Sequence, residues 1–432
     1  MAIRLEDRLL SDLAAGFEGR FSERVPTPRT VGREAEFPVV GADGRAGRVE
    51  RLWAQVLAEG GCEPLRDEAG PGGGGLLIGV RSGGWSAVAE VGRGTVEVVV
   101  GPRPSIHDLA ADLDAALRRL IPAARRAGLR LLGYGIQPRT PPHRALMTPK
   151  RRYDALLRAI GPRWLRFAVT ASDQVHLDVT RDELIPSVNL LNAVAGAVIA
   201  VTANSPVYGG RPGGHASGRE ALMAGTTGEP YRHGAIPRPF ADIQEYVTWA
   251  SGFRCLCLPD GGGGYRLPPG SYLDHARRRG ADLEEFLFHE HYLWPSARPR
   301  ARLGTLEVRP ACQQPGEASW APAALAVGLG EALSDASVAM EELLGPGAWP
   351  LLLRYRAAAV RLGARAPEPA PGFLEALLDV AEGGLKARGY GEETLVEPLR
   401  ERVAARSGPA DLARSLMGAG GITELIDAMA LA

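Results

Sequence analysis

Five short segments in which apolar and polar residues alternate constrain this chain more than any other feature of its sequence. They occupy residues 33–39, 86–90, 95–100, 174–179 and 305–309. Alternation with a period of two is typical of β-strands, because successive side chains of a strand point to opposite faces. The acids and the imidazole on the polar faces are Glu34, Glu36, Glu90, Glu97, His176 and Glu307. We therefore predict strands that carry carboxylates on one face.

These acidic faces have two ordinary interpretations and one functional one. A half-solvated antiparallel sheet has a polar outer face, and the 48 arginines of the chain are numerous enough to pair with the glutamates. A buried acid is costly unless a partner neutralises it, and these faces are short and mostly acidic rather than mixed. If the strands belong to one sheet, five glutamates and one histidine would meet in a pocket.

A set of carboxylates with one imidazole is a hard ligand set. It suits Mg²⁺ or Mn²⁺ better than zinc, and protein-bound magnesium usually completes its shell with water and substrate phosphates. The sheet face therefore favours an enzyme that uses a nucleoside triphosphate. The only lysines, Lys150 and Lys386, do not lie in a Gly-Lys-Ser/Thr sequence, which excludes a Walker-type phosphate loop. Because phosphoryl transfer is mostly positioning and charge neutralisation, metals and arginines would suffice.

The charge balance and the hydropathy pattern bear on partners and location. Fifty basic and fifty acidic residues cancel, which argues against binding to nucleic acid or to an anionic membrane. The first ten residues are charged and lack the apolar core of a secretory signal. The longest apolar stretch, 190–203, is too short and too polar to span a bilayer. We expect a cytoplasmic protein that acts on small molecules, and we leave its oligomeric state open.

Helical patterns occur both before and between the strands. We predict helices over 4–17, 106–127 and 184–203. The second is the clearest, because its apolar residues repeat at steps of three and four. Ser105 is a good N-cap for it, with Asp108 three residues further on.

The composition changes after Pro315, where the chain becomes rich in alanine and leucine. We predict a single catalytic domain over 1–432, in which 28–315 carries the sheet and 316–432 is mainly helical. Glycine-rich segments such as 69–75 are interpreted as ordinary turns.

A series of short motifs resembles a known family, the plant-type glutamate–cysteine ligases, which has bacterial members. The match extends over about residues 28–395, and the collinear order of the motifs makes it specific. The motifs lie at 32–37, 90–97, 133–138, 149–154, 174–178, 203–206, 210–219, 246–247, 306–309 and 389–390.

This resemblance implies a fold and an activity. The fold is α+β, an antiparallel sheet curved into a funnel and covered by helices, with the catalytic architecture of glutamine synthetase. Two or three Mg²⁺ ions are implied on its inner face. The implied reaction is ATP-dependent: the γ-carboxylate of glutamate is phosphorylated, and the amino group of cysteine attacks the acyl phosphate to give γ-glutamylcysteine.

The resemblance also implies roles for individual residues. The implied metal ligands are Glu34, Glu36, Glu90, Glu97, His176 and Glu307. Arg309, together with Glu307, is the implied catalytic residue, because its guanidinium would reach phosphate or acyl-phosphate oxygens. The implied substrate-binding residues are Arg219, Asn204, Tyr246 and Gln174, and the implied nucleotide-binding residues are Lys150 and Arg152.

The chain departs from the plant pattern at three points, one of which is Arg151 in place of a glycine. The hairpin has one residue more between Glu90 and Glu97, so which of these two acids ligates metal stays open. The segment 310–315 does not resemble the plant continuation, so the amine acceptor stays open as well. Outside the motifs, His289 and His291 are interpreted as part of a packed aromatic segment rather than as a metal pair.

Two other functions compete with a γ-glutamyl amide ligase. A metal-dependent amide hydrolase would use the same carboxylates without ATP. A non-catalytic relative would only bind a small molecule, but the presence of all six proposed metal ligands argues against it. Within the ligase class, a different amine acceptor or a different carboxylate donor remains an alternative.

Overall fold

The computed structural model describes residues 2–67 and 75–432, so nearly all of the glycine-rich segment at 69–75 lies outside the described residues. Within that part of the chain, nine strands form one sheet in the order β14-β15-β7-β1-β5-β4-β3-β2, with β6 paired to the end of β1. Every pairing in this sheet is antiparallel. The strands are β1 (Val31–Gly41), β2 (Glu63–Arg66), β3 (Leu77–Ser82), β4 (Trp85–Ala89), β5 (Thr95–Arg103), β6 (Leu129–Leu131), β7 (Ser172–Asp178), β14 (Ala297–Arg300) and β15 (Thr305–Cys312). The predicted fold class, an antiparallel sheet covered by helices, is confirmed.

All five alternating segments lie in or directly beside strands of this one sheet. The register brings their polar residues together. Glu36 on β1 lies opposite Glu97 on β5, and Glu307 on β15 lies opposite His176 on β7. The condition on which the pocket depended, that the strands share a sheet, is therefore met.

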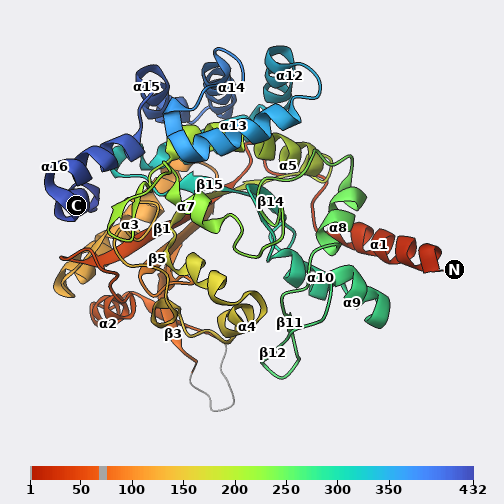
Figure 1. Cartoon of the computed structure of the whole chain (residues 1–432), viewed down its shortest axis with the longest axis horizontal. Coiled ribbons are helices and arrows are strands. Elements are labelled where there is room, and N and C mark those ends of the chain that lie inside the picture. The colour runs from red at the N-terminus through yellow and green to blue at the C-terminus, as the bar shows by residue number, and fades with distance from the viewer. Residues whose placement is uncertain (1, 68–74) are drawn as a thin grey trace.

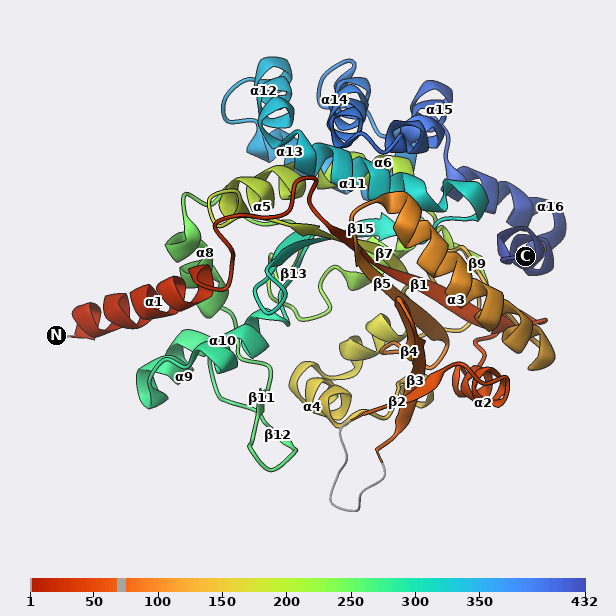
Figure 2. The same ribbon diagram turned by 180° about the vertical axis from the view of Figure 1, so that it is seen from behind.

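The two faces of the sheet have different covers. On β1 the alternate residues Val31, Ala35 and Phe37 are buried in the main hydrophobic core. Helices α3, α5, α6 and α11 cover this apolar face, and each packs on at least one of its strands. Figure 2 shows the sheet curving from β15, beside α6 and α11, down to β3 and β2. The acids therefore lie on the opposite face, which the curvature makes concave.

Two of the three predicted helices form as expected, and the third is divided. The helices are α1 (Ala2–Glu18), α3 (Ile106–Arg126), α5 (Leu184–Ala193) and α6 (Ala195–Thr202). The side chain of Ser105 caps α3 and accepts a hydrogen bond of 3.0 Å from the backbone N–H of Asp108. The prediction of one helix over 184–203 was wrong: Val194 leaves helical geometry, and the two halves meet at 47°.

The chain beyond Pro315 is helical, as predicted, and stacks on the helices that cover the sheet (Figure 1). Its helices are α11 (Ala321–Glu331), α12 (Leu333–Leu344), α13 (Trp349–Leu362), α14 (Phe373–Arg388), α15 (Glu397–Ala405) and α16 (Pro409–Met429). Helix α13 packs on α6, and α14 packs on α11. Buried Arg388 of α14 pairs with Glu331 of α11 and, at 2.7 Å, with Glu392. The packing of α13 on α6 and of α11 on β7 joins the last quarter of the chain to the back of the sheet.

The remaining elements are not all on one side of the sheet. They are the helices α2 (Glu50–Ala58), α4 (Arg151–Ile160), α7 (Gly218–Met223), α8 (Ile243–Ser251), α9 (Tyr272–Arg279) and α10 (Leu283–Glu290), the short strand pairs β8 (Val207–Tyr208) with β9 (Arg211–Pro212), β10 (His233–Gly234) with β13 (Trp294–Pro295) and β11 (Leu258–Pro259) with β12 (Tyr265–Arg266), and the 3₁₀ turns η1 (Arg144–Leu146), η2 (Pro162–Val169), η3 (Gly316–Trp320), η4 (Gly363–Arg365) and η5 (Glu392–Val396). Among them, η4 and η5 pack on the helices behind the sheet. Taken singly, no helix in the described part of the chain is long and apolar enough to cross a membrane, while two bent pairs, α5 with α6 and 318–331 with α12, pass on length and composition.

Candidate functional site

The concave face of the sheet forms one wall of a cavity of about 290 Å³. Strands β1, β5, β7, β14 and β15 supply its polar side chains, and α4, η2 and the segment after α10 supply aromatic ones. The sequence-predicted residues that line it are Glu34, Glu36, Glu90, Glu97, Arg152, Gln174, Arg219, Glu307 and Arg309. Residues spread over most of the chain therefore meet at one place.

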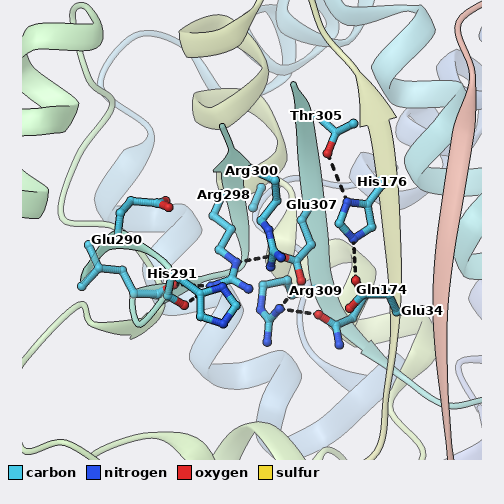
Figure 3. Close-up of polar contacts among 12 residues, drawn as sticks. Glu34, Gln174, His176, Glu290, His291, Arg298, Arg300, Thr305, Glu307 and Arg309 are labelled. Atoms are coloured by element: carbon cyan, nitrogen blue, oxygen red, sulfur yellow. Dashed lines mark hydrogen bonds and ion pairs between the residues drawn. The ribbon is translucent and has the colours of Figure 1, made fainter. Parts of the chain in front are cut away.

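One group of possible metal ligands, the first triad, consists of Glu34, His176 and Glu307, whose ligand atoms all lie within 4.8 Å of one another. Glu34 and His176 are in direct contact, with 3.1 Å between Oε1 and Nε2. The other ring nitrogen of His176, Nδ1, lies 3.1 Å from the hydroxyl of Thr305 (Figure 3). The histidine ring is thus held from both sides. Burial alone would raise the pKa of Glu34, but the hydrogen bond and charge of His176 outweigh it and lower the pKa.

Arginines surround the third member of this triad. Glu307 is fully buried, and it pairs with Arg298 at 2.5 Å, with Arg300 at 3.0 Å and also with Arg309. Figure 3 shows the three guanidinium groups converging on its carboxylate. Burial opposes ionisation, but the three positive charges hold the pKa of Glu307 well below its usual range. The first triad is therefore compensated by the charges of the protein itself.

Arg298 and Arg300 are cavity residues that sequence analysis missed. Both lie on β14, which the sequence Ala-Arg-Pro-Arg did not reveal because it is short and contains a proline. The signal was nevertheless present: two arginines with a spacing of two stand one short turn before the alternating segment 305–309. A hairpin places them beside Glu307, and the register pairs Arg298 with Glu307 directly.

The second triad consists of Glu36, Glu90 and Glu97, whose carboxylate oxygens also come within 4.8 Å of one another. Both acids of the hairpin therefore lie in it. Within the described residues, none of these three glutamates forms an ion pair with a basic side chain. Glu36 accepts hydrogen bonds from the backbone N–H of Ser172 at 2.6 Å and from the side chain of Gln174 at 2.8 Å.

The electrostatics of the second triad differ from those of the first. Burial, followed by the nearby charge of Glu90, raises the pKa of Glu36 to about 8. Burial and the neighbouring carboxylates also raise the pKa of Glu97 well above its usual range. Arg219 and Lys150 act on this triad only from a distance, and three acids without an ion-pair partner are unfavourable in a buried site. The triad therefore has the composition and the unbalanced charge that fit a divalent cation.

The rest of the cavity combines two arginines with an aromatic wall. Arg219 of α7 lines the cavity and is almost fully buried. Trp164 and Phe167 of η2 pack against each other and against Trp294 at tilted angles of 34° to 49°, with ring centroids 4.6 to 6.2 Å apart. Arg152 of α4 stands over the ring of Tyr153 at 5.0 Å. The cavity thus offers an apolar side next to its charged floor.

Four predicted site residues are not part of the cavity lining, and one of them, His176, lies directly behind it in contact with Glu34. Asn204 is buried, and its amide donates to the backbone carbonyls of Gly133 and Gln313 at 2.9 and 2.8 Å. Tyr246 packs in the hydrophobic core, and its hydroxyl donates to Glu290 at 2.7 Å. Lys150 donates from its ammonium group to the backbone carbonyl of Ala89 at 3.0 Å, beside the second triad. Collinear motifs locate such residues along the chain but do not reveal where their side chains point.

The pair of histidines after α9 is divided between two environments. His289 is buried, stacks on Tyr272 and bonds to the backbone carbonyl of Ala250 at 2.9 Å. This agrees with the prediction of a packed aromatic segment. His291 packs edge-on against Tyr292 and also lines the cavity, and within the described residues it belongs to neither group of possible metal ligands. The segment is a helix that ends at Glu290, and the residue that follows a helix can turn its side chain toward the sheet.

The sequence matches the glutamate–cysteine ligase family 2 over residues 30–428. A stretch of 208 residues is 34% identical to the "Putative glutamate--cysteine ligase 2-2" of Frankia alni, which covers 46% of this chain and 51% of that protein. A stretch of 182 residues is 29% identical to the chloroplastic glutamate–cysteine ligase of Arabidopsis thaliana, over 40% of this chain and 34% of that protein. The chain thus spans about half or less of the length of the curated relatives it matches.

The fold has a counterpart among solved structures. The structure of a glutamate–cysteine ligase from Francisella tularensis in complex with AMP superposes with a TM-score of 0.57, at 10% identity, over 93% of this chain and 87% of that one. At this identity the likeness bears on the fold. The fold and the two triads together define the class of protein: an antiparallel sheet whose concave face carries carboxylates inside a cavity. More specifically, because the family match extends over most of the sequence, this chain belongs to the glutamate–cysteine ligase family 2.

Proposed function

We propose that this protein is an ATP-dependent carboxylate–amine ligase that joins the γ-carboxylate of L-glutamate to the amino group of L-cysteine. The observation that carries the proposal is the charge pattern of one cavity. Two groups of carboxylates lie on the sheet, one of them without an ion pair in the described structure, and a cluster of arginines stands beside them. Metal ions and nucleotide phosphates are the partners that balance both signs at once.

The two triads are the proposed sites of two Mg²⁺ ions, which Mn²⁺ could replace. Glu34, His176 and Glu307 would hold one ion, and the second triad would hold the other. Carboxylate oxygens with a single imidazole fit these hard cations. When bound, the ions supply charge neutralisation for the phosphates and fix their orientation.

The arginines of β14 and β15 are the proposed phosphate-binding groups. Three of them share the single carboxylate of Glu307, so the cluster keeps an excess of positive charge. Guanidinium groups bind phosphate oxygens through paired hydrogen bonds. Arg309 also contacts Gln174 beside the second triad, which places it between the two groups of acids. Arg152, which lines the same cavity, would extend this binding surface toward the rest of the nucleotide.

Arg219 is the proposed partner of the α-carboxylate of glutamate. It lines the cavity, and its Nε has no hydrogen-bond partner within the described residues although it is buried. A buried cationic donor without a partner is unfavourable, and a substrate carboxylate would satisfy it. Gln174, which bonds to Glu36, is the second proposed substrate-binding residue.

The proposed reaction proceeds in two steps. The γ-carboxylate of glutamate attacks the terminal phosphorus of ATP, which yields an acyl phosphate and ADP. The amino group of the acceptor then attacks the acyl carbon, the amide bond forms, and phosphate leaves as the amine loses a proton. Arg309 is positioned to bind the transferred phosphoryl group in both steps, and the aromatic residues around Trp164 exclude water that would hydrolyse the acyl phosphate.

The test is an ADP-release assay across pairs of amino acids and amines, with each product identified by mass spectrometry. The proposal predicts ADP formation that requires Mg²⁺, glutamate and cysteine together, with γ-glutamylcysteine as the product. A larger rate with another amine would keep the reaction class and change the acceptor. Cleavage of a γ-glutamyl amide with metal alone, without ATP, would favour the hydrolase.

A further inference from the structure

Arg219 is held by an ion pair that helix geometry alone does not produce. Its Nη1 donates to Oε1 of Glu220 at 2.6 Å, and both side chains are buried. The two residues are consecutive in α7, and side chains at consecutive helical positions do not face each other. Something else must therefore turn the carboxylate of Glu220 toward Arg219.

The other oxygen of this carboxylate is bound by a residue from the C-terminal helices. Nη2 of Arg356, on α13, donates to Oε2 of Glu220. With one arginine on each oxygen, the plane of the carboxylate is fixed, and Oε1 can only face Arg219. Arg356 stands some 136 residues further along the chain than Glu220, so the bond ties the region beyond Pro315 to the wall of the cavity.

Two glycines on neighbouring elements leave room for Arg356. Gly234 and Gly196 both lie against Arg356: a Cβ built on Gly234 would meet Nη2 at 2.4 Å, and one on Gly196 would meet the Arg356 backbone at 3.0 Å. Because Gly234 also has a φ of +80°, a side chain is disfavoured there for two reasons. The close approach of α13 to β10 and α6 therefore requires two residues without side chains.

We propose that Arg356 is a positioning residue for substrate binding, which acts through Glu220 on Arg219. With Nη1 occupied by Glu220, the guanidinium of Arg219 keeps the edge formed by Nε and Nη2 for a ligand, and Nε is without a partner in the described structure. This edge is the one that grips a carboxylate through two parallel hydrogen bonds. The inference rests on the proposed function, in that the carboxylate is taken to be that of the amino-acid substrate.

The experiment compares three variants of the full chain. Arg356→Ala removes the contact, Arg356→Lys keeps the charge and one donor, and Arg354→Ala changes an exposed arginine two positions earlier on the same helix. For each we would measure kcat, the KM values for glutamate and for ATP, and the melting temperature. Binding of glutamate without ATP would be measured by calorimetry.

Arg356→Ala is expected to raise the KM and the Kd for glutamate by about ten-fold or more, the scale of a lost charge-assisted hydrogen bond. The kcat and the KM for ATP should change by less than about two-fold. Arg356→Lys should recover part of the glutamate affinity, and Arg354→Ala should behave as wild type. A folded Arg356→Ala protein with unchanged glutamate affinity overturns the proposal. So does an equal loss in every parameter that Arg356→Lys does not relieve.

Failure of the proposed function would be recognised separately. If the wild type shows no glutamate-dependent ADP release with any amine, the reaction is wrong. The positioning role is then decided by the shift in melting temperature that each of the common amino acids causes. An amino acid that stabilises the wild type and Arg354→Ala, but not Arg356→Ala, supports it. Absence of any such stabilisation in the wild type overturns it.

Discussion

The two carboxylate triads occupy the same cavity but are balanced in opposite ways. In the first, Glu307 is surrounded by three arginines and Glu34 bonds to His176, and the pKa values of both acids are lowered. In the second, the acids face one another without a basic partner in the described structure, and the pKa values of Glu36 and Glu97 are raised. The first triad is therefore compensated by protein charges, whereas the second is balanced by bound protons or by an external cation.

Because of this difference, removing a carboxylate charge should have different consequences for the reaction and for the fold in the two triads. Removing a charge from the compensated triad leaves arginines without their partner, which affects both the reaction and the fold. Removing a charge from the uncompensated triad relieves repulsion, which impairs the reaction but does not destabilise the fold. Substitutions that remove charge at equal size, Glu to Gln, can distinguish the two cases.

The largest effect is expected for Glu307→Gln. Turnover should fall below detection, because the variant loses a proposed metal ligand and the residue that orders three arginines. Stability should fall too, since removal of one partner from a buried ion pair costs about 3–5 kcal/mol. Steady-state assays and urea denaturation measure the two effects. This loss of stability follows from the burial of Glu307 and its contacts with Arg298 and Arg300. Full Mg²⁺-dependent activity in this variant would remove Glu307 from the metal site.

Glu97→Gln should sharpen the contrast. We expect turnover to fall by about a hundred-fold, the scale of a lost contribution to charge stabilisation. The metal-free variant should be as stable as the wild type or more so, because one of three buried, repelling acids is gone. The same assays apply, with EDTA in the denaturation buffer. A loss of stability similar to that of Glu307→Gln would contradict the proposed division into compensated and uncompensated triads.

The sequence allowed the composition of the cavity to be predicted better than its internal organisation. The period-two pattern placed Glu34 with Glu36 on one face, because strand geometry alone decides which side chains share a face. It could not show that these two neighbours belong to different triads. That depends on the register, which sets Glu36 opposite Glu97 and His176 opposite Glu307, and register is a property of paired strands.

Other parts of the site were beyond reach for similar reasons. Arg298 lies on a four-residue strand whose proline hides the alternation. Tyr246 and Asn204 were selected from motif order, which fixes a place in the chain but not the direction of a side chain. The role of Arg356 depends on the packing of α13 on α6. No pattern in the residues of either helix indicates that the two helices pack together. Long-range packing was thus the least predictable component.

The stability of the metal-free protein should fall as the pH rises, because a carboxyl of the second triad holds its proton more tightly in the folded state. The carboxyl of Glu36 loses its proton near 4.5 when unfolded and at about 8 when folded. Between these values the folded state holds the extra proton, so its stability should fall as the pH rises. Glu34 and Glu307 have lowered pKa values, so their contributions are present above about 4.5 and are lost only in more acidic solution. Melting temperatures between pH 5 and 8 with EDTA test this.

Two controls belong to that measurement. Saturating Mg²⁺ should flatten the fall in melting temperature, because the bound cation replaces the proton as the balancing charge. Glu36→Gln should reduce the slope without metal. An equally steep fall with and without Mg²⁺ would show that the second triad does not bind this ion under the conditions used.

The smallest effect is expected for a residue that orients a member of the first triad but is not itself a proposed metal ligand. The hydroxyl of Thr305 lies 3.1 Å from Nδ1 of His176, whose Nε2 faces Glu34. Partners of this kind fix the ring of a metal-binding histidine, and their loss typically weakens metal affinity by about ten-fold. Thr305→Val should therefore raise the Mg²⁺ concentration needed for half-maximal activity while leaving the rate at saturating Mg²⁺ near that of the wild type.

Thr148→Val is the matched control, because the hydroxyl of Thr148 donates to the backbone carbonyl of Glu90 rather than to a proposed ligand atom. If both variants shift the Mg²⁺ dependence equally, the contact with Thr305 does not orient a ligand. If only Thr305→Val does, the two triads can be tuned separately, as their different electrostatics imply.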